Sequence, residues 1–233
     1  MEKFSVVAKD ESKIDEIREI AEKKGLKYVS KDPHFVISLG GDGTFLISEN
    51  KFPGVPKLLI RDSKICKKCV GSSKETILDF IKLNAFEIKE ELKLEGSFRD
   101  NEFIAINDII IRNKVPNQAI RFDVSINAEK KLSEVIGDGI VVATPFGSSA
   151  YFKSITRQTF DEGLGIAFSN SVEYLEPMYV KKNQVIKVKL TRGDAEVAFD
   201  NERKVYIVKE GELIIIRKAA VGAKIITLEG FEE

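Results

Sequence analysis

Residues 38–44 (SLGGDGT) constrain this chain most, because they place three glycines around one aspartate directly after an apolar run. That run, residues 35–37, predicts a short buried strand. Glycine tolerates positive φ and lets a ligand approach the backbone closely, and Thr44 is expected to cap a short helix over residues 45–47. Backbone N–H groups at such a helix start form an anion site, where Asp42 would be out of place unless it does chemistry. The alternative is an ordinary tight turn with a solvated aspartate.

The front of the chain alternates strand-like and helix-like segments. Helices are expected over residues 11–24 and 72–83, where apolar side chains recur at helical spacing. Strands are expected at residues 3–8, 26–29, 35–39 and 57–60. This alternation indicates a Rossmann-like α/β domain with a parallel sheet, in which ligands bind beyond the carboxyl ends of the strands. The glycine turn is expected at one of those ends.

Beyond residue 86 strand-like runs follow one another with few helical stretches. They cover residues 103–112, 120–126, 139–143, 184–190, 195–199, 204–208, 212–217 and 224–228. Alternating apolar and polar residues indicate packed sheets, a β-sandwich. We therefore predict an α/β domain over residues 1–85 and a β-rich domain over residues 86–233, with a ligand site in the cleft between them.

Composition narrows the class of protein. Lys+Arg and Asp+Glu both number 37, so no global positive field indicates nucleic acid and no basic run indicates a membrane surface. No apolar run approaches the ~18 residues of a membrane span, and the N-terminus lacks the pattern of a signal peptide. A cytoplasmic protein is expected. The high charge content with only two Met and two Cys is typical of thermophilic proteins.

Cys66 and Cys69 form a single Cys-x-x-Cys pair among lysines. A redox or zinc role is conceivable because neighbouring lysines lower a thiol pKa. A structural zinc normally takes four ligands, and the sequence has no second cysteine pair and only one histidine, His34. The favoured interpretation is two reduced thiols in a loop.

Residues 136–151 (IGDGIVVATPFGSSAY) form the second informative stretch. A strand over residues 140–143 runs into a turn rich in proline, glycine and small hydroxyl residues. Small residues let a planar ring lie close to the backbone, hydroxyl and N–H groups can contact its polar edges, and Tyr151 can stack on it. The alternative is a β-turn whose tyrosine lies in the core.

Together these stretches resemble the NAD kinases, which belong to a superfamily that also contains the diacylglycerol kinases. The family's Gly-Gly-Asp-Gly-Thr stands intact at residues 40–44. Its Asn-Glu pair on a strand is similar to Asn107-Asp108, and its Asp-Gly…Thr-Pro-x-Gly-Ser-Thr-Ala-Tyr is similar to residues 138–151, with Ser149 for the usual Thr. Three motifs in the same order are far more specific than one.

The resemblance implies phosphoryl transfer from ATP or polyphosphate to the 2′-hydroxyl of the adenosine ribose of NAD, giving NADP. Asp42 would be the catalytic base. Neutralising the donor implies Mg²⁺ or another divalent cation, held mostly by phosphates and water, so no metal ligand is assigned to the chain. The implied partners are NAD and ATP, with no nucleic acid or membrane, and the implied assembly is a homodimer or homotetramer.

The resemblance also implies a set of binding residues in several groups. Those expected to contact phosphates are Gly40, Gly41, Gly43 and Thr44. Asn107 and Asp108 are expected to hold the adenosine of NAD, and Asp138 is expected near the nicotinamide end. The residues expected to line the adenine and ribose pocket are Thr144, Ser148, Ser149, Ala150 and Tyr151.

The chain departs from the family pattern at several places. Residues 61–69 replace a Gly-Leu-Gly-Phe-Leu type loop, residues 152–157 replace a Ser-Ala-Gly-Gly run, and the late Asp-Gly-Gln resembles only residues 200–202 (DNE). Two alternatives follow: a divergent kinase of another hydroxyl substrate, such as a lipid or sphingoid base, and a non-catalytic nucleotide-binding regulator. The lipid kinases should lack the Thr-Pro-x-Gly-Ser turn, and the intact Asp42 argues against a regulator.

Overall fold

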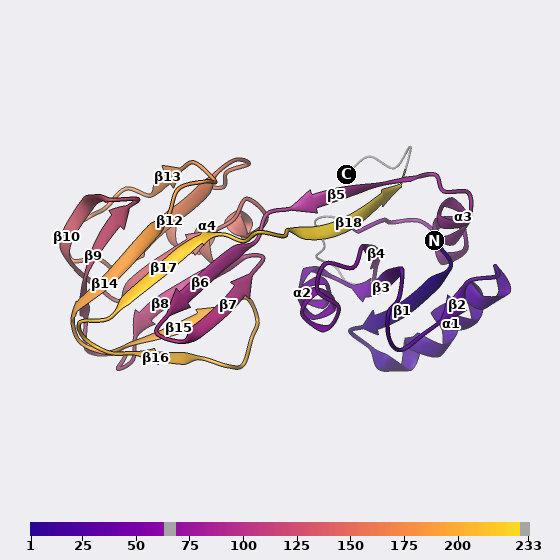
Figure 1. Ribbon diagram of the computed structural model, residues 1–233, viewed down its shortest axis with the longest axis horizontal. Helices are drawn as coiled ribbons and strands as arrows, with labels where there is room; N and C mark the ends of the chain where they lie inside the picture. Colours follow the sequence, from indigo (N-terminus) through magenta and orange to yellow (C-terminus); the bar gives the residue numbers. More distant parts are fainter. Residues whose placement is uncertain (63–68, 229–233) are drawn as a thin grey trace. The chain divides into compact units, whose positions relative to one another are not determined.

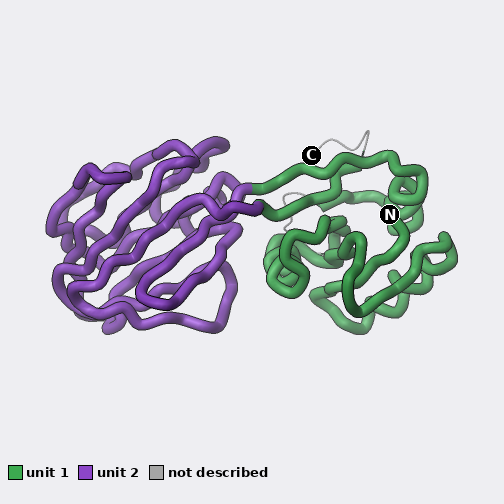
Figure 2. Tube along the Cα trace, viewed as in Figure 1, with its two compact units in different colours: residues 1–91, 222–233 green, residues 92–221 purple. Residues whose placement is uncertain are grey.

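The computed structural model describes residues 1–62 and 69–228. The chain divides into two compact units, residues Met1–Glu91 with Gly222–Glu233 as unit 1 and residues Leu92–Val221 as unit 2 (Figure 2). Within the described residues, no helix is long and apolar enough to cross a membrane.

Unit 1 is built on a six-stranded sheet in the order β2-β1-β3-β4-β18-β5 (Figure 1). Its strands are β1 (Lys3–Ala8), β2 (Lys27–Tyr28), β3 (Phe35–Gly40), β4 (Lys57–Arg61), β5 (Phe86–Glu91) and β18 (Ala223–Leu228). The neighbouring strands β2, β1, β3, β4 and β18 pair in parallel. The edge strand β5 pairs antiparallel with β18. The predicted α/β unit with a parallel sheet is therefore confirmed.

The helical elements of unit 1 are η1 (Glu11–Lys13), α1 (Ile14–Lys23), α2 (Asp42–Lys51) and α3 (Lys74–Lys82). On α1 the buried residues are Ile17 and Ala21, four apart on one face, and they pack in the core with residues of α3. Every residue of β3 is buried, which is typical of a parallel strand covered on both faces. The backbone that leads into the glycine turn is therefore fixed from both sides of the sheet.

Unit 2 is a sandwich of two antiparallel six-stranded sheets, ordered β10-β9-β14-β17-β6-β7 and β13-β12-β11-β8-β15-β16. The first sheet contains β6 (Leu94–Phe98), β7 (Asn101–Ala105), β9 (Ile120–Ile126), β10 (Glu129–Gly137), β14 (Ile186–Arg192) and β17 (Leu213–Lys218). The second contains β8 (Asp108–Asn113), β11 (Gly139–Ala143), β12 (Leu164–Ser169), β13 (Met178–Val180), β15 (Ala195–Phe199) and β16 (Tyr206–Val208). The predicted β-rich fold of packed sheets is confirmed.

Strict alternation along the strands builds the core of the sandwich. On β9 the buried residues are Ile120, Phe122, Val124 and Ile126, while the residues between them are half-buried. They join one apolar cluster with residues from both sheets. The outer face of the second sheet is covered by η2 (Phe146–Ser149) and α4 (Tyr151–Thr156), where Phe152 is fully buried.

The units differ from the predicted domains at both borders. The predicted second domain began at residue 86 and ran to the end of the chain, but β5 and β18 pair with each other and belong to the sheet of unit 1. Their pairing joins segments more than 130 residues apart, which local patterns do not reveal. The predicted strand over residues 103–112 is two strands, β7 and β8, separated by a turn at residues 106–107.

Candidate active site

Asp42 is the first residue of α2, two residues beyond the end of β3, so the glycine turn lies at the carboxyl edge of the parallel sheet as predicted. A Cβ atom at Gly40 would lie 2.1 Å from Oγ1 of Thr44 and 3.3 Å from Cβ of Lys9. The glycine is needed because the turn folds back closely on itself. Positive φ is not used, since Gly41 is extended (φ −133°, ψ −164°) and Gly43 lies within the helix.

Thr44 does not cap the helix, which corrects the sequence-based prediction. The helix begins at Asp42 with Gly41 as its N-cap residue, and it extends to Lys51 rather than covering residues 45–47 alone. Thr44 lies in the first turn, where its N–H donates to the carbonyl of Gly41 at 2.9 Å and its side chain is buried. The start of α2 thus places the first backbone N–H groups of the helix beside Asp42.

The far end of α2 is fixed by a buried ion pair. Lys57 on β4 is fully buried and donates to a carboxylate oxygen of Glu49 and, at 2.6 Å, to the carbonyl of Phe52. The other carboxylate oxygen of Glu49 accepts from the N–H of Gly54 at 3.0 Å. The helix that carries Asp42 is therefore tied to the neighbouring strand through charged hydrogen bonds, which are stronger than neutral ones.

In unit 2, Asn107 and Asp108 lie in the turn from β7 to β8, and Asp200 holds this turn. One carboxylate oxygen of Asp200 accepts from the N–H of Asn107 at 2.7 Å, and both oxygens accept from the N–H of Ile106, at 2.8 and 3.1 Å. Asp200 itself follows β15 with φ +47°, a left-handed conformation that aspartate tolerates. Sequence reasoning assigned it no role, although residues 200–202 stood where the family has Asp-Gly-Gln.

Burial raises the pKa of Asp200 to about 6 from its ordinary value of 3.8, although the N–H groups of Ile106, Asn107 and Asp108 favour the charged form. The folded protein therefore binds more protons than the unfolded chain between these two pH values. The contribution of this group to the free energy of unfolding is largest below about pH 4, falls as the pH rises through the window, and is level above about pH 6.

We expect Asp200→Asn to remove this pH dependence. Asparagine keeps an oxygen for the N–H groups and has no charge to desolvate. The free energy of unfolding of the wild type, relative to the variant, should fall by roughly 2–3 kcal/mol between about pH 4 and pH 7. Urea titrations of both proteins across this range measure it, and parallel curves would contradict the assignment.

Thr144, at the end of β11, connects the Asn107 turn to the glycine- and serine-rich turn. Its N–H donates to the carbonyl of Asn107 at 2.9 Å, its hydroxyl donates to the carbonyl of Ile106 at 2.5 Å, and the same hydroxyl accepts from the N–H of Gly147 at 3.0 Å. The side chain is fully buried. Thr144 thus positions the two turns against each other through backbone contacts.

Gly147 makes the closest approach in this region. A Cβ atom there would lie 2.0 Å from the carbonyl oxygen of Asn107 and 2.5 Å from its Cα. Any side chain would push the two turns apart, because backbone atoms cannot give way as a flexible side chain can. The glycine of the Thr-Pro-x-Gly-Ser pattern is therefore a packing requirement of the turn pair.

Side chains around these two turns differ in burial and in hydrogen-bond partners. Oδ1 of Asn107 is buried and has no hydrogen-bond partner among the residues that the structure describes. Ser148 is buried, Ser149 is exposed, and Tyr151 is 41% exposed, so the alternative that Tyr151 lies in the core is wrong. An orphaned amide oxygen beside exposed hydroxyl and aromatic groups is what a polar planar ligand could satisfy.

Asp138 lies at the opposite end of β11 from Thr144, about 20 Å away at the rise of an antiparallel strand. Its side chain accepts from the amide of Asn170 at 2.7 Å and lies 3.5 Å from the amide of Asn113. The structure therefore brings Asn107, Asp108, Thr144 and residues 148–151 together in unit 2 and places Asp138 apart from them. Asp42 and its glycines belong to unit 1.

The cysteine pair was expected to be two reduced thiols. Cys69 is disulfide-bonded in the structure, so the expectation is wrong for this residue, and Cys66 lies outside the described residues. Among the residues described, no group of three or more His, Cys, Asp or Glu side chains is arranged to hold a metal ion.

Comparison with known proteins identifies relatives of this chain. Residues 106–228 match the ATP-NAD kinase C-terminal domain family. A NAD kinase of Sulfurisphaera tokodaii is 30% identical over 206 residues, covering 85% of this chain and 78% of the relative. A NAD kinase of Saccharolobus islandicus is 30% identical over 222 residues, covering 91% and 87%.

Solved structures share the fold. A crystal structure of an NAD kinase from Archaeoglobus fulgidus in complex with ATP aligns with a TM-score of 0.81 at 21% identity, covering 97% of this chain and 94% of that chain. Yeast NADH kinase complexed with NADH aligns with a TM-score of 0.82 at 15% identity, covering 97% and 83%. On the evidence of the family match and the sequence relatives, this chain belongs to the NAD kinase family.

Proposed function

We propose that this protein is an NAD kinase, which transfers a phosphoryl group from ATP to the 2′-hydroxyl of the adenosine ribose of NAD and so forms NADP. Family membership supports the reaction class. The observation that carries the substrate assignment is the buried, partnerless Oδ1 of Asn107 beside the turn of residues 144–151. A donor group on the adenosine part of NAD would satisfy it.

We assign the role of general base to Asp42. A ribose hydroxyl is a poor nucleophile until a carboxylate accepts its proton, and the rest of phosphoryl transfer is mainly positioning and charge neutralisation. Asp42 stands at the start of a ten-residue helix, whose positive dipole end would favour phosphate oxygens. Gly40 and Gly41 permit the tight approach that sets this geometry.

We also assign NAD-binding roles to residues of unit 2. Asn107 would accept a hydrogen bond from the adenosine. Asp108, at the start of β8, would also contact the adenosine. Ser148, Ser149, Ala150 and Tyr151 would line the adenine and ribose pocket, with Thr144 acting as a positioning residue. Asp138, at the far end of β11, would contact the nicotinamide part of the extended dinucleotide.

Mg²⁺ bound with ATP would neutralise negative charge on the donor phosphates. We assign no protein ligand to this ion, which phosphate oxygens and water would hold. Polyphosphate is a second donor compatible with the same chemistry. A homodimer or homotetramer in the cytoplasm remains our expectation, and sedimentation showing only monomer at working concentrations would contradict the assembly.

The direct test is incubation with NAD, ATP and Mg²⁺, with product detected by an NADP-specific dehydrogenase. NADP formation supports the proposal. Binding of NAD in calorimetry without NADP would instead indicate a regulator, and neither binding nor product would indicate another hydroxyl substrate, such as a lipid or sphingoid base.

We expect Tyr151→Ala to raise the KM for NAD by roughly 5- to 150-fold with a smaller effect on kcat, because stacking of a base on an aromatic ring is worth about 1–3 kcal/mol. The exposed ring is available to a ligand, and its loss should cost little packing. Steady-state kinetics with thermal melts as the control measure this. An unchanged KM with a lowered melting temperature would make Tyr151 structural.

A further inference from the structure

A second pocket lies within unit 2, away from the turns of residues 106–108 and 144–151. It has a volume of about 570 Å³, which is in the range of small-molecule sites. It is formed where β9 begins, where β10 and β14 end, and by the loop that follows β8. Its lining residues are Lys114, Val115, Gln118, Ala119, Ile120, Arg121, Ile136, Arg192, Gly193 and Asp194.

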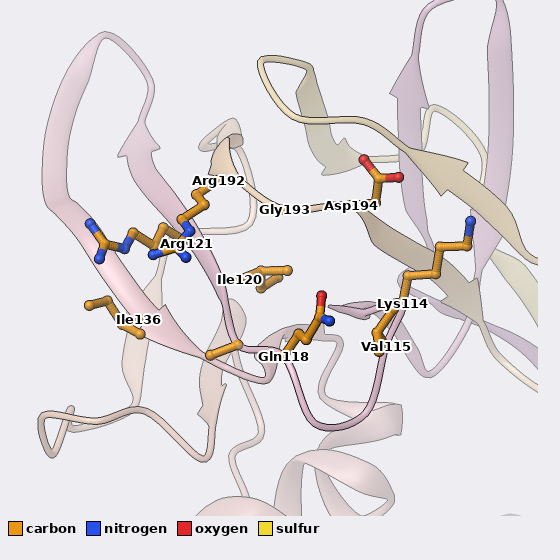
Figure 3. Close-up of a pocket in the computed structure, with 10 residues that line it drawn as sticks. Lys114, Val115, Gln118, Ile120, Arg121, Ile136, Arg192, Gly193 and Asp194 are labelled. Carbon is orange, nitrogen blue, oxygen red and sulfur yellow. The ribbon is translucent and has the colours of Figure 1, made fainter.

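Two arginines stand opposite each other on one side of this pocket. Arg121 on β9 and Arg192 at the end of β14 are direct cross-strand partners, just after a register shift in that ladder. Figure 3 shows their side chains together on one side, with Lys114 and Asp194 on the other. Like charges directly opposite in a sheet are destabilising, so this pair costs stability unless an anion lies between them.

Acidic groups near the pocket compensate part of this positive charge, but none of them forms an ion pair with Arg192 among the described residues. Asp194 is paired with Lys209 at 2.7 Å, and that hydrogen bond lowers the pKa of its carboxyl group. Glu134 on β10 lies 3.7 Å from Arg121, at the outer limit of an ion pair. Glu210 accepts from the N–H of Gly193. The charge of Lys114 also helps to lower the pKa of Asp194, which leaves Arg192 as the cation of the pocket with no ion pair among the described residues.

One apolar side chain lies beside the arginines, and the pocket wall is built by the protein's own hydrogen bonds. Ile136 is half-buried as the cross-strand neighbour of Arg121, whereas Ile120 belongs to the core of the sandwich. The loop after β8 is held by the buried Asn113, whose amide donates to the carbonyls of Val115 at 3.0 Å and Gln118 at 3.2 Å. These hydrogen bonds fix the loop in place, which lowers the ordering cost of binding.

We infer that this pocket binds a small organic phosphate, with its phosphoryl group between Arg121 and Arg192 and a flat apolar body against Ile136. Paired guanidinium groups match phosphate geometry, and the apolar side chain of Ile136 favours a ligand that carries more than a free phosphate ion. The site uses none of the residues assigned to the phosphoryl transfer reaction, so it goes beyond the proposed function and does not depend on it.

Phenyl phosphate is the probe, because it carries one phosphate on a flat ring. In ¹⁵N-edited NMR of the full chain, titration should shift the side-chain Nε–H signals of Arg121 and Arg192 and saturate. Arg192→Gln should weaken binding at least about tenfold, since a charged hydrogen-bond donor is lost, and Arg121→Gln should act in the same direction. The matched control is Arg217→Gln, an exposed arginine of β17 outside the pocket, which should bind as the wild type does.

A thermal melt gives an independent measurement. Arg192→Gln should melt above the wild type without ligand, because cross-strand repulsion is relieved, and phenyl phosphate should raise the melting temperature of the wild type more than that of the variant. Absence of saturable shifts at the two arginines, equal affinity of Arg192→Gln and wild type, or equal loss in the Arg217→Gln control would each overturn the proposal.

Discussion

Replacement of Asp42 by asparagine is expected to lower kcat by roughly 10²–10⁴, the usual contribution of one positioned general base. Asparagine has nearly the same shape but cannot accept the hydroxyl proton. The start of α2 should keep its geometry, since Gly41 rather than Asp42 is the N-cap residue and the close packing of the turn is set by Gly40 and Thr44. NAD affinity should change modestly, because a negative charge beside phosphates is removed.

Steady-state kinetics and thermal melts of wild type and Asp42→Asn measure these effects together. Asp79→Asn is the matched control, because Asp79 is an exposed, salt-bridged aspartate of α3, and its turnover should stay within a few-fold of the wild type. A wild-type kcat in Asp42→Asn would remove Asp42 from catalysis. Loss of folding would instead make Asp42 a structural residue of the helix start.

Lys57→Met should destabilise the protein by about 3–5 kcal/mol, the usual cost of leaving one member of a buried ion pair without its partner. Lys57 is fully buried and holds both Glu49 and the carbonyl of Phe52 at the end of α2. Methionine fills a similar volume but removes the positive charge that is paired with Glu49. Urea unfolding monitored by circular dichroism gives the free energy difference.

The double variant Glu49→Leu with Lys57→Met is the control for this prediction. Replacing a buried pair with apolar residues of similar volume is often neutral, so most of the lost stability should return. If the double variant were as unstable as Lys57→Met alone, the loss would reflect packing rather than an unpaired charge, and the account of how α2 is fixed would be wrong.

Local patterns were sufficient for much of the fold because the informative features are short-range. The alternation of strands and helices before residue 86 predicted a parallel sheet. Apolar residues recur at every second position along β9 and β14, which predicted strands with one face in the core of a sandwich. The place of Asp42 at a carboxyl edge followed from a glycine turn after a buried strand. Each inference needed only neighbouring residues.

What escaped prediction depends on contacts between distant segments. The membership of β18 in the first sheet rests on pairing with β4 and β5, which no local pattern encodes. Asp200 became visible as a positioning residue only when its carboxylate was seen to accept from the backbone at residues 106–107. The side-chain hydrogen bonds of Thr144 and the facing pair of Arg121 and Arg192 likewise depend on strand register.

The central claim, transfer of phosphate to the adenosine ribose of NAD, is tested most directly by ³¹P NMR of a reaction containing the protein, NAD, ATP and Mg²⁺. The account predicts ADP and one new phosphomonoester resonance in equal amounts, with the phosphorus coupled to the proton on ribose carbon 2′. An ester at another hydroxyl, or ATP hydrolysis to free phosphate without any ester, would contradict it.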